Sequence, residues 1–280
     1  MGPDFDSPSV SFLKRCFQTA ALTALVLLFS FGVAEAADVD VQTGFEFTWW
    51  RDSERNVGYQ GFIPLKLSAQ IREFSVSVLG GYAHTAYEPG SGGQNDSLSH
   101  PLDTKVNFSY ALLDKLPFDV LFGLDFNLPT GKTALNTRDL VLIMDPDLVP
   151  ITRLGEGYNV NPTVSVAKAW GKWAAGLGVG YNLRGTYDYT TEIRKYSPGD
   201  ICTVTAETRY EISPSWTARL FGQYDYFAKA KVEGHDFYQE GDFYLAGAGL
   251  RYGRTAWDTI ASFKYVHRAK SDLQNSAGSL

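Results

Sequence analysis

The chain has 280 residues, a net charge of −6 at pH 7 and 44% hydrophobic residues. The acidic balance excludes the basic surface that a nucleic-acid-binding domain presents, so no nucleic-acid partner is expected. The two cysteines are Cys16 and Cys202, and if Cys16 leaves with a leader peptide no intrachain disulfide can form.

The N-terminus has the features of a secretory signal peptide. Lys14-Arg15 precedes an apolar run over 20–33, and Ala34-Glu35-Ala36 supplies a small-x-small cleavage site. The alternative, a transmembrane anchor, needs about 20 apolar residues, which is longer than this run. We therefore expect a signal peptide over 1–36, secretion to the periplasm, and one mature domain over 37–280.

The segment 173–184 shows the clearest strand pattern of the chain. Every second residue from Trp173 to Leu183 is apolar, and the residues between are small, polar or charged, ending in Arg184. This period of two predicts an extended strand with one apolar face. The run exceeds the usual strand of roughly 5–6 residues and reaches the length of about 9–11 that crosses a bilayer at a tilt.

Similar patterns recur along the mature chain and predict about eleven strands. They cover 42–51, 57–71, 73–85, 101–112, 117–128, 159–169, 173–188, 200–212, 216–228, 242–253 and 256–268. Short turns alternate with longer loops near 86–100, 129–158, 189–199 and 229–241, with one exception, the short first outer turn from Asp52 to Asn56. Outer-membrane barrels show this alternation, with short periplasmic turns and long extracellular loops.

The predicted fold class is therefore all-β: a transmembrane, antiparallel, up-and-down β-barrel. Single-chain bacterial barrels have an even number of strands, so we expect twelve in full, with the final strand missing from this sequence. Trp170, Trp173, Trp216 and Trp257 lie at strand ends beside short turns, where aromatic rings favour the headgroup level of a membrane.

The same alternation places charged residues on the face opposite the lipid. The pore-lining candidates are Asp103, Lys105, Asp125, Arg184, Glu207, Arg209, Arg219, Asp225, Arg251 and Lys264. Charges on the lipid face would cost roughly 2–4 kcal/mol each at mid-depth, so one parity collects them. Both signs occur, and two interpretations stay open: ion pairs that brace a narrow barrel, or the polar lining of a pore.

The loop over 129–158 is the longest and has an apolar centre. Its constriction candidates are Leu140, Leu142, Met144, Asp145 and Asp147. The loop can fold into the barrel mouth, lie on the outer-leaflet surface, or pack against the barrel rim. Acidic residues of this loop suit Ca²⁺ but also suit a solvated rim, so we predict neither a metal site nor a cofactor.

Several short motifs together resemble one known family. They are Asp103-Thr104-Lys105-Val106, the strand end Leu128-Pro129-Thr130-Gly131, the return Gly155-Glu156-Gly157-Tyr158, and the glycine-rich strand that begins beside Trp173. In this order they resemble the outer-membrane β-barrel family labelled for the meta-pathway of phenol degradation. The resemblance covers about 75–265 and implies a channel-like protein of the outer membrane, for hydrophobic or aromatic compounds.

The leading functional hypothesis is an outer-membrane channel or transporter for small molecules, hydrophobic or aromatic ones included. The alternatives are a structural or surface barrel with a plugged lumen, and an outer-membrane hydrolase. His84, His100, His235 and His267 lie near the outer loops without a recognisable catalytic constellation, so we predict no enzyme. The expected partners are the lipid bilayer and lipopolysaccharide of a Gram-negative outer membrane, a small-molecule solute, periplasmic chaperones and the barrel-assembly machinery.

Overall fold

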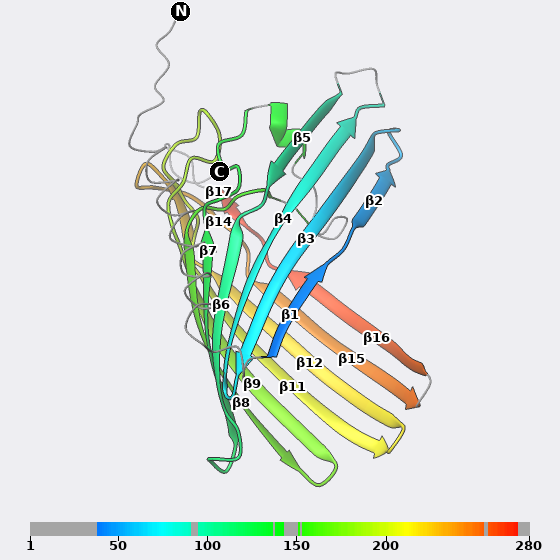
Figure 1. The fold of residues 1–280 in the computed structure, drawn as a ribbon. Coiled ribbons are helices and arrows are strands. Elements are labelled where there is room, and N and C mark those ends of the chain that lie inside the picture. Colours follow the sequence, from blue (N-terminus) through cyan, green and yellow to red (C-terminus); the bar gives the residue numbers. More distant parts are fainter. Residues whose placement is uncertain are drawn as a thin grey trace, which may run out of the picture.

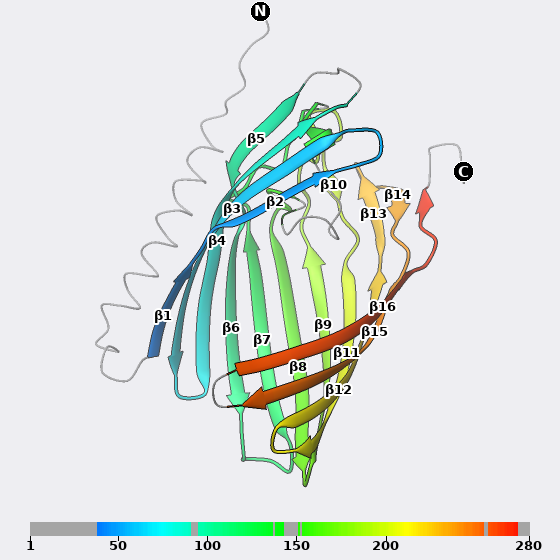
Figure 2. The same ribbon diagram turned by 90° about the vertical axis from the view of Figure 1, so that its right-hand side faces the viewer.

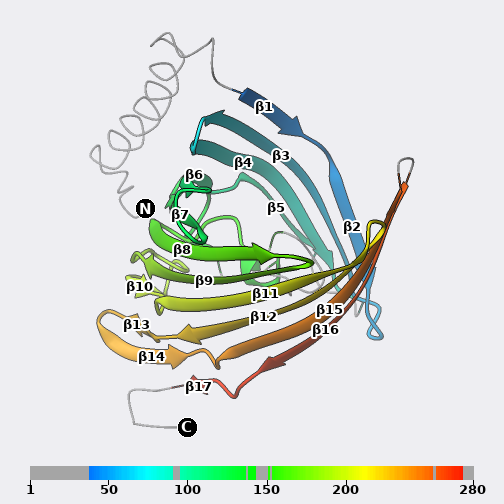
Figure 3. The ribbon, with the colours of Figure 1, turned by 90° about the horizontal axis from the view of Figure 1, so that it is seen from below.

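The computed structural model describes residues 38–90, 95–136, 138–142, 151, 153–254 and 257–273. The predicted signal peptide over 1–36 lies outside these residues. One large antiparallel sheet dominates the fold and curves into a barrel wall (Figures 1 and 3). The prediction of an all-β, antiparallel, up-and-down barrel fold is confirmed.

The large sheet has thirteen strands, and most neighbours in the sheet are also neighbours in the sequence. Its strands are β1 (Asp38–Thr43), β2 (Glu46–Arg51), β3 (Val57–Ile71), β4 (Phe74–Glu88), β5 (Asp96–Pro101), β6 (Thr104–Leu112), β7 (Asp119–Leu128), β8 (Asn159–Trp170), β9 (Trp173–Arg184), β11 (Ile201–Ser213), β12 (Trp216–Phe227), β15 (Phe243–Arg254) and β16 (Trp257–Arg268). A small second sheet contains β10 (Tyr196–Ser197), β13 (Lys229–Val232), β14 (His235–Gln239) and β17 (Asp272–Leu273).

One predicted strand is divided in the structure, and one predicted loop contains a further strand. The predicted strand 42–51 becomes β1 and β2, which both pair with β3 and are separated at Gly44. The predicted strand 101–112 becomes β6, whereas β5 forms within the segment near 86–100 that was predicted as a loop; both pair with β4, and Leu102 and Asp103 lie between them. In both places a long partner strand, β3 or β4, continues past the break and spans it.

Apart from the short β2–β3 turn over 52–56, the tight hairpins of the large sheet gather at one end and the longer connections at the other (Figure 1). The β8–β9 turn shows why the hairpins can be so short, because Gly171 takes a φ of +55° that few other residues adopt. Arg72 and Asp114 take similar positive values beside the β3–β4 and β6–β7 turns. The predicted alternation of loop length thus corresponds to two different ends of the barrel wall.

Within the described residues the sheet order runs from β1 to β16, and no strand ladder joins these two edges. Figure 2 shows the curved wall with β1 and β16 as separate edges. The prediction that a closing strand is missing from this sequence stays a prediction. In the part of the chain that the structure describes, no helix is both long and apolar enough to cross a membrane.

The outward face of the sheet is apolar and exposed, the reverse of a water-soluble fold. On β9, Leu177 is 50% exposed and Val179 is 42% exposed, and on β16 Phe263 reaches 70%. Soluble proteins rarely leave such continuous apolar surface uncovered. The hydrocarbon of a bilayer would cover this face without cost. An apolar outward face of this kind therefore suits a closed or lipid-embedded sheet.

Aromatic side chains mark both ends of the strands. At the hairpin end, Trp173 lies against Tyr210 and Trp216 against Tyr252, with ring centroids 4.6 Å apart in each pair. At the other end the ring pairs are Tyr224 with Tyr244, at 5.0 Å, and Tyr244 with His267, at 6.0 Å. Rings at these two levels suit the two headgroup regions of a bilayer.

Candidate channel lumen and its mouth

The long loop identifies the inner face of the wall. Gln60 on β3 and Thr85 on β4 are register partners, and loop residue Ile151 binds Gln60. The segment that carries η2 (Arg138–Leu142) lies inside the curve of the sheet when it is seen from below (Figure 3). Strand positions with the parity of Gln60 therefore face the interior, and their neighbours face outward.

Asp125 forms the centre of a short polar ladder on this inner face. Asn107 Nδ2 donates to one carboxylate oxygen at 2.5 Å, and Asn161 Nδ2 donates to the other at 3.1 Å. The three residues come from β6, β7 and β8, which register places side by side. Asp225, on β12, accepts a hydrogen bond from Gln223 at 2.8 Å and is 8% exposed.

The hairpin end of the inner face carries a cluster of ionised groups. Glu207 accepts hydrogen bonds from Arg209 Nε and from Arg219 Nη2, both at 2.5 Å. Arg251 pairs with Asp258 at 2.7 Å. The arginine side chains are exposed, by 61% at Arg209 and 47% at Arg219, so the pairs lie along an open surface and not within a packed core.

The remaining wall candidates behave differently from one another. Lys105 and Lys264 are exposed at inner positions, and neither has an ion-pair partner among the described residues. Arg184 lies at the mouth, where its backbone N–H donates to Asp200 at 2.9 Å. Its Nε is buried without a hydrogen-bond partner in the described part of the chain.

Asp103 lies in the mouth and fastens the long loop at both of its ends. Its carboxylate accepts the backbone N–H of Gly131 at 2.8 Å and that of Glu156 at 2.6 Å. It also accepts from Asn127 Nδ2 at 2.6 Å. The residue is 8% exposed, and this burial raises the pKa of its carboxyl. Asp103 thus positions the loop and does not line an open path.

Replacing Asp103 by alanine is expected to release the loop ends while the wall remains folded. Two backbone N–H groups and one amide would lose their acceptor, at about 1–3 kcal/mol for each donor that stays buried and unpaired. Asp103→Asn keeps one acceptor oxygen and should have a smaller effect. Limited proteolysis of folded protein measures this, with cleavage within 129–158 faster in the alanine variant. Equal cleavage rates in all three proteins would contradict the fastening role.

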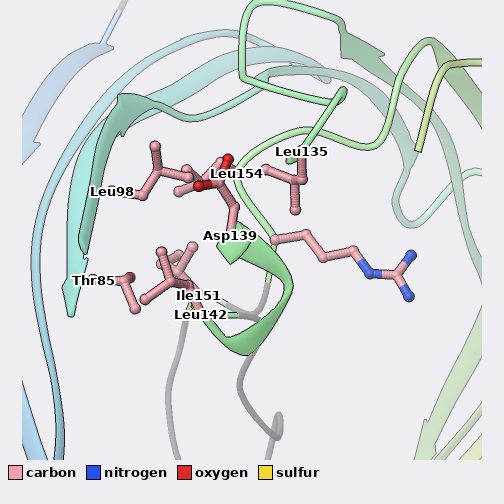
Figure 4. Close-up of a pocket in the computed structure, with 8 residues that line it drawn as sticks. Thr85, Leu98, Leu135, Asp139, Leu142, Ile151 and Leu154 are labelled. Atoms are coloured by element: carbon pink, nitrogen blue, oxygen red, sulfur yellow. The ribbon is translucent and has the colours of Figure 1, made fainter. Parts of the chain in front are cut away.

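The apolar centre of the loop packs against the inner face of β4 and β5. Loop and wall residues together enclose a cavity of about 20 Å³ (Figure 4). The loop contributes Leu135, Leu142 of η2, Ile151 and Leu154, and the wall contributes Thr85 and Leu98. That volume holds about one water molecule. Of the three arrangements predicted for the loop, the described residues combine two, since the loop folds into the mouth and packs against the wall there.

Gln60 clamps the loop from the wall side. Its Nε2 donates to the carbonyl of Ile151 at 2.7 Å and to Thr85 Oγ1 at 3.0 Å, and its Oε1 accepts the N–H of Ile151 at 3.1 Å. Gln60 is 1% exposed. Its partner lies 91 residues further along the chain, so no local pattern could have pointed to the contact.

Arg153 extends from the loop toward a group of tyrosines beyond β9. Its guanidinium lies 5.6 Å from the ring centroid of Tyr189, a cation–π distance. Tyr187 and Tyr196 pack edge to face at 5.6 Å beside it. Burial raises the pKa of Tyr187 to about 12, so its hydroxyl stays neutral at physiological pH. These contacts extend the packed mouth toward the β9 side of the wall.

Of the predicted constriction residues, Leu140 is half-buried and Leu142 is buried in the mouth. Met144, Asp145 and Asp147 lie outside the described residues. A neighbouring acidic residue, Asp139, pairs with Lys132 at 3.1 Å and accepts the N–H of Asn136. No group of three histidine, cysteine, aspartate or glutamate side chains suited to a metal ion occurs within the described ranges.

Comparisons with known proteins support the fold. No family model matches the chain, and no curated protein matches it. Among solved structures, the COG4313 outer membrane channel from Pseudomonas putida F1 is similar, with a TM-score of 0.51 and 12% sequence identity. The likeness covers 84% of this chain and 87% of that chain, so it extends over nearly the whole wall. At this identity it shows that the chain has the fold of an outer-membrane channel.

Proposed function

We propose that this protein is an outer-membrane channel or transporter for small molecules. The observation that carries the proposal is the exposed, charged inner wall, above all Arg209 and Arg219 beside Glu207. Side chains that only braced a packed interior would be buried among their neighbours. The apolar outward face and the likeness to a channel of known structure support the same reading.

The finer parts of the proposal concern place and cargo. We place the tight hairpins on the periplasmic side of a Gram-negative outer membrane, after secretion directed by residues 1–36. We also propose that the protein is a member of the family labelled for the meta-pathway of phenol degradation and that its solute is hydrophobic or aromatic. The proposed partners are lipopolysaccharide, periplasmic chaperones and the barrel-assembly machinery.

A barrel with a plugged lumen is the second candidate, and the packed mouth favours it. The loop fills the space against β4 and β5 down to a cavity of about one water. Catalysis forms no part of the proposal. The His84 ring contacts Ser99 at 2.6 Å on the exposed outward side, and among the described residues no carboxylate bonds to that ring.

Solute uptake into proteoliposomes tests the proposal. Vesicles that contain the refolded protein should swell in iso-osmotic solutions of small neutral solutes, faster for smaller solutes than for larger ones. Vesicles prepared with heat-denatured protein supply the control. If swelling matches the control for every solute, the plugged barrel replaces the channel.

Glu207→Gln is expected to shift the ion selectivity of the proposed channel toward anions. Glu207 balances Arg209 and Arg219, and its neutralisation leaves two exposed cations on the inner wall. A wall of one sign raises the local concentration of counter-ions. The reversal potential under a salt gradient measures the shift, and Asp258→Asn, which frees Arg251, should move it in the same direction. A shift toward cations would contradict an inner-wall location for this cluster.

A further inference from the structure

The outward face of β8 and β9 contains an open groove of about 400 Å³ near the hairpin end. Its outward-facing lining residues are Phe118, Val166, Lys168, Trp170, Ala175 and Leu177. The groove exists because Ala175 is small while Trp170 and Leu177, on either side of it, are large. Apart from Lys168, every one of these side chains is apolar.

Lys168 is a cation on the face that otherwise meets lipid. Its register partner is Ala175, two residues from Leu177 and Trp173 on the outward parity of β9. Lys168 is exposed and has no ion-pair partner among the described residues. Because a lysine is costly near mid-bilayer but costs little at the interface, its amine must reach the headgroup level. Trp170 and Trp173 lie at that same level.

We propose that this groove binds one anionic phospholipid, with an acyl chain along the apolar lining and the phosphate on the Lys168 amine. The charge of Lys168 complements a headgroup that carries net negative charge. The other outward-facing residues of the groove offer only apolar contacts, which suit an acyl chain. The choice of a phospholipid rests on the proposed orientation, in which the hairpin end faces the periplasmic leaflet. It does not rest on channel activity.

Native mass spectrometry of the detergent-solubilised full chain tests the site, with phosphatidylglycerol and phosphatidylcholine of equal acyl length as probes. The wild type should retain one phosphatidylglycerol in preference to phosphatidylcholine. Lys168→Gln should lower phosphatidylglycerol retention about fivefold, which corresponds to ~1 kcal/mol for a basic side chain near an anionic lipid. Ala175→Phe should fill the groove and lower the retention of both lipids.

Lys172→Gln is the matched control, because Lys172 lies in the β8–β9 turn four residues away and does not line the groove. It should leave retention unchanged. The site is disproved if the wild type retains both lipids equally, if Lys168→Gln retains phosphatidylglycerol as the wild type does, or if Lys172→Gln loses as much as Lys168→Gln. Circular dichroism confirms that each variant is folded. Because no readout depends on conductance, failure of the channel proposal would not affect these results.

Discussion

Replacing Leu177 by arginine is expected to lower the free energy of unfolding by about 2–4 kcal/mol in a bilayer, which is the cost of an arginine on the lipid face near the midplane. Leu177 lies midway along β9 between Trp173 and Tyr181 and is 50% exposed on the outward face. Reversible unfolding from lipid vesicles in denaturant measures the change. A variant that fails to insert at all would also agree with the expected cost.

The matched control is Leu121→Arg. Leu121 is 45% exposed, and through Ser165 it lies in register with Gly178, the neighbour of Leu177, but its register partners Ala111 and Ser165 are on the inner face. An arginine there would enter the lumen and should cost much less. Gly178 is a poor control, although it also faces inward, because an added Cβ would lie 2.7 Å from Thr205 Oγ1. Equal losses in the two arginine variants would overturn the assignment of the faces.

Deleting 138–152 and bridging the ends with a short flexible linker is expected to raise solute uptake severalfold while the wall remains folded. The deletion removes Leu142 and Ile151, which fill the mouth against β4 and β5. It leaves Asp103 and its bonds to Gly131 and Glu156 in place. Proteoliposome swelling measures the rate, and circular dichroism measures the strand content.

Gln60→Ala supplies a milder form of the same test. It removes both hydrogen bonds to the Ile151 backbone but leaves the loop sequence intact, so uptake should rise less than in the deletion. If both variants fold normally and uptake stays at the wild-type rate, the loop does not control passage. Loss of stability with unchanged uptake would show that the loop only braces the wall.

The strands were predictable because apolar residues at every second position indicate both an extended strand and which of its two faces is apolar. In the strand from Trp173 to Arg184 one face must be apolar, and the ladders place each residue on the face that the alternation predicts. Glu207, Arg209 and Arg219 were likewise expected on one face, and the structure brings them into contact. The break at Gly44 and the strand β5, which lies within the loop predicted near 86–100, were missed because in both places a distant partner strand, β3 or β4, supplies the pairing.

The organisation of the mouth could not be predicted in the same way. Asp103 was expected on the lumen wall because its parity matches Lys105, yet its three bonds hold the loop. The contacts of Gln60 with Ile151 and of Arg153 with Tyr189 join distant segments. Such contacts depend on how a long irregular segment folds back over the sheet, and no periodic pattern encodes that path.

Single-channel recording in a planar lipid bilayer tests the central claim most directly, with the refolded full-length protein and the 138–152 deletion compared side by side. We expect discrete conductance steps from the full-length protein and larger steps from the deletion variant, because the loop narrows the mouth that the wall surrounds. If neither protein conducts although both insert and remain folded, the lumen carries no open path and the channel account is wrong.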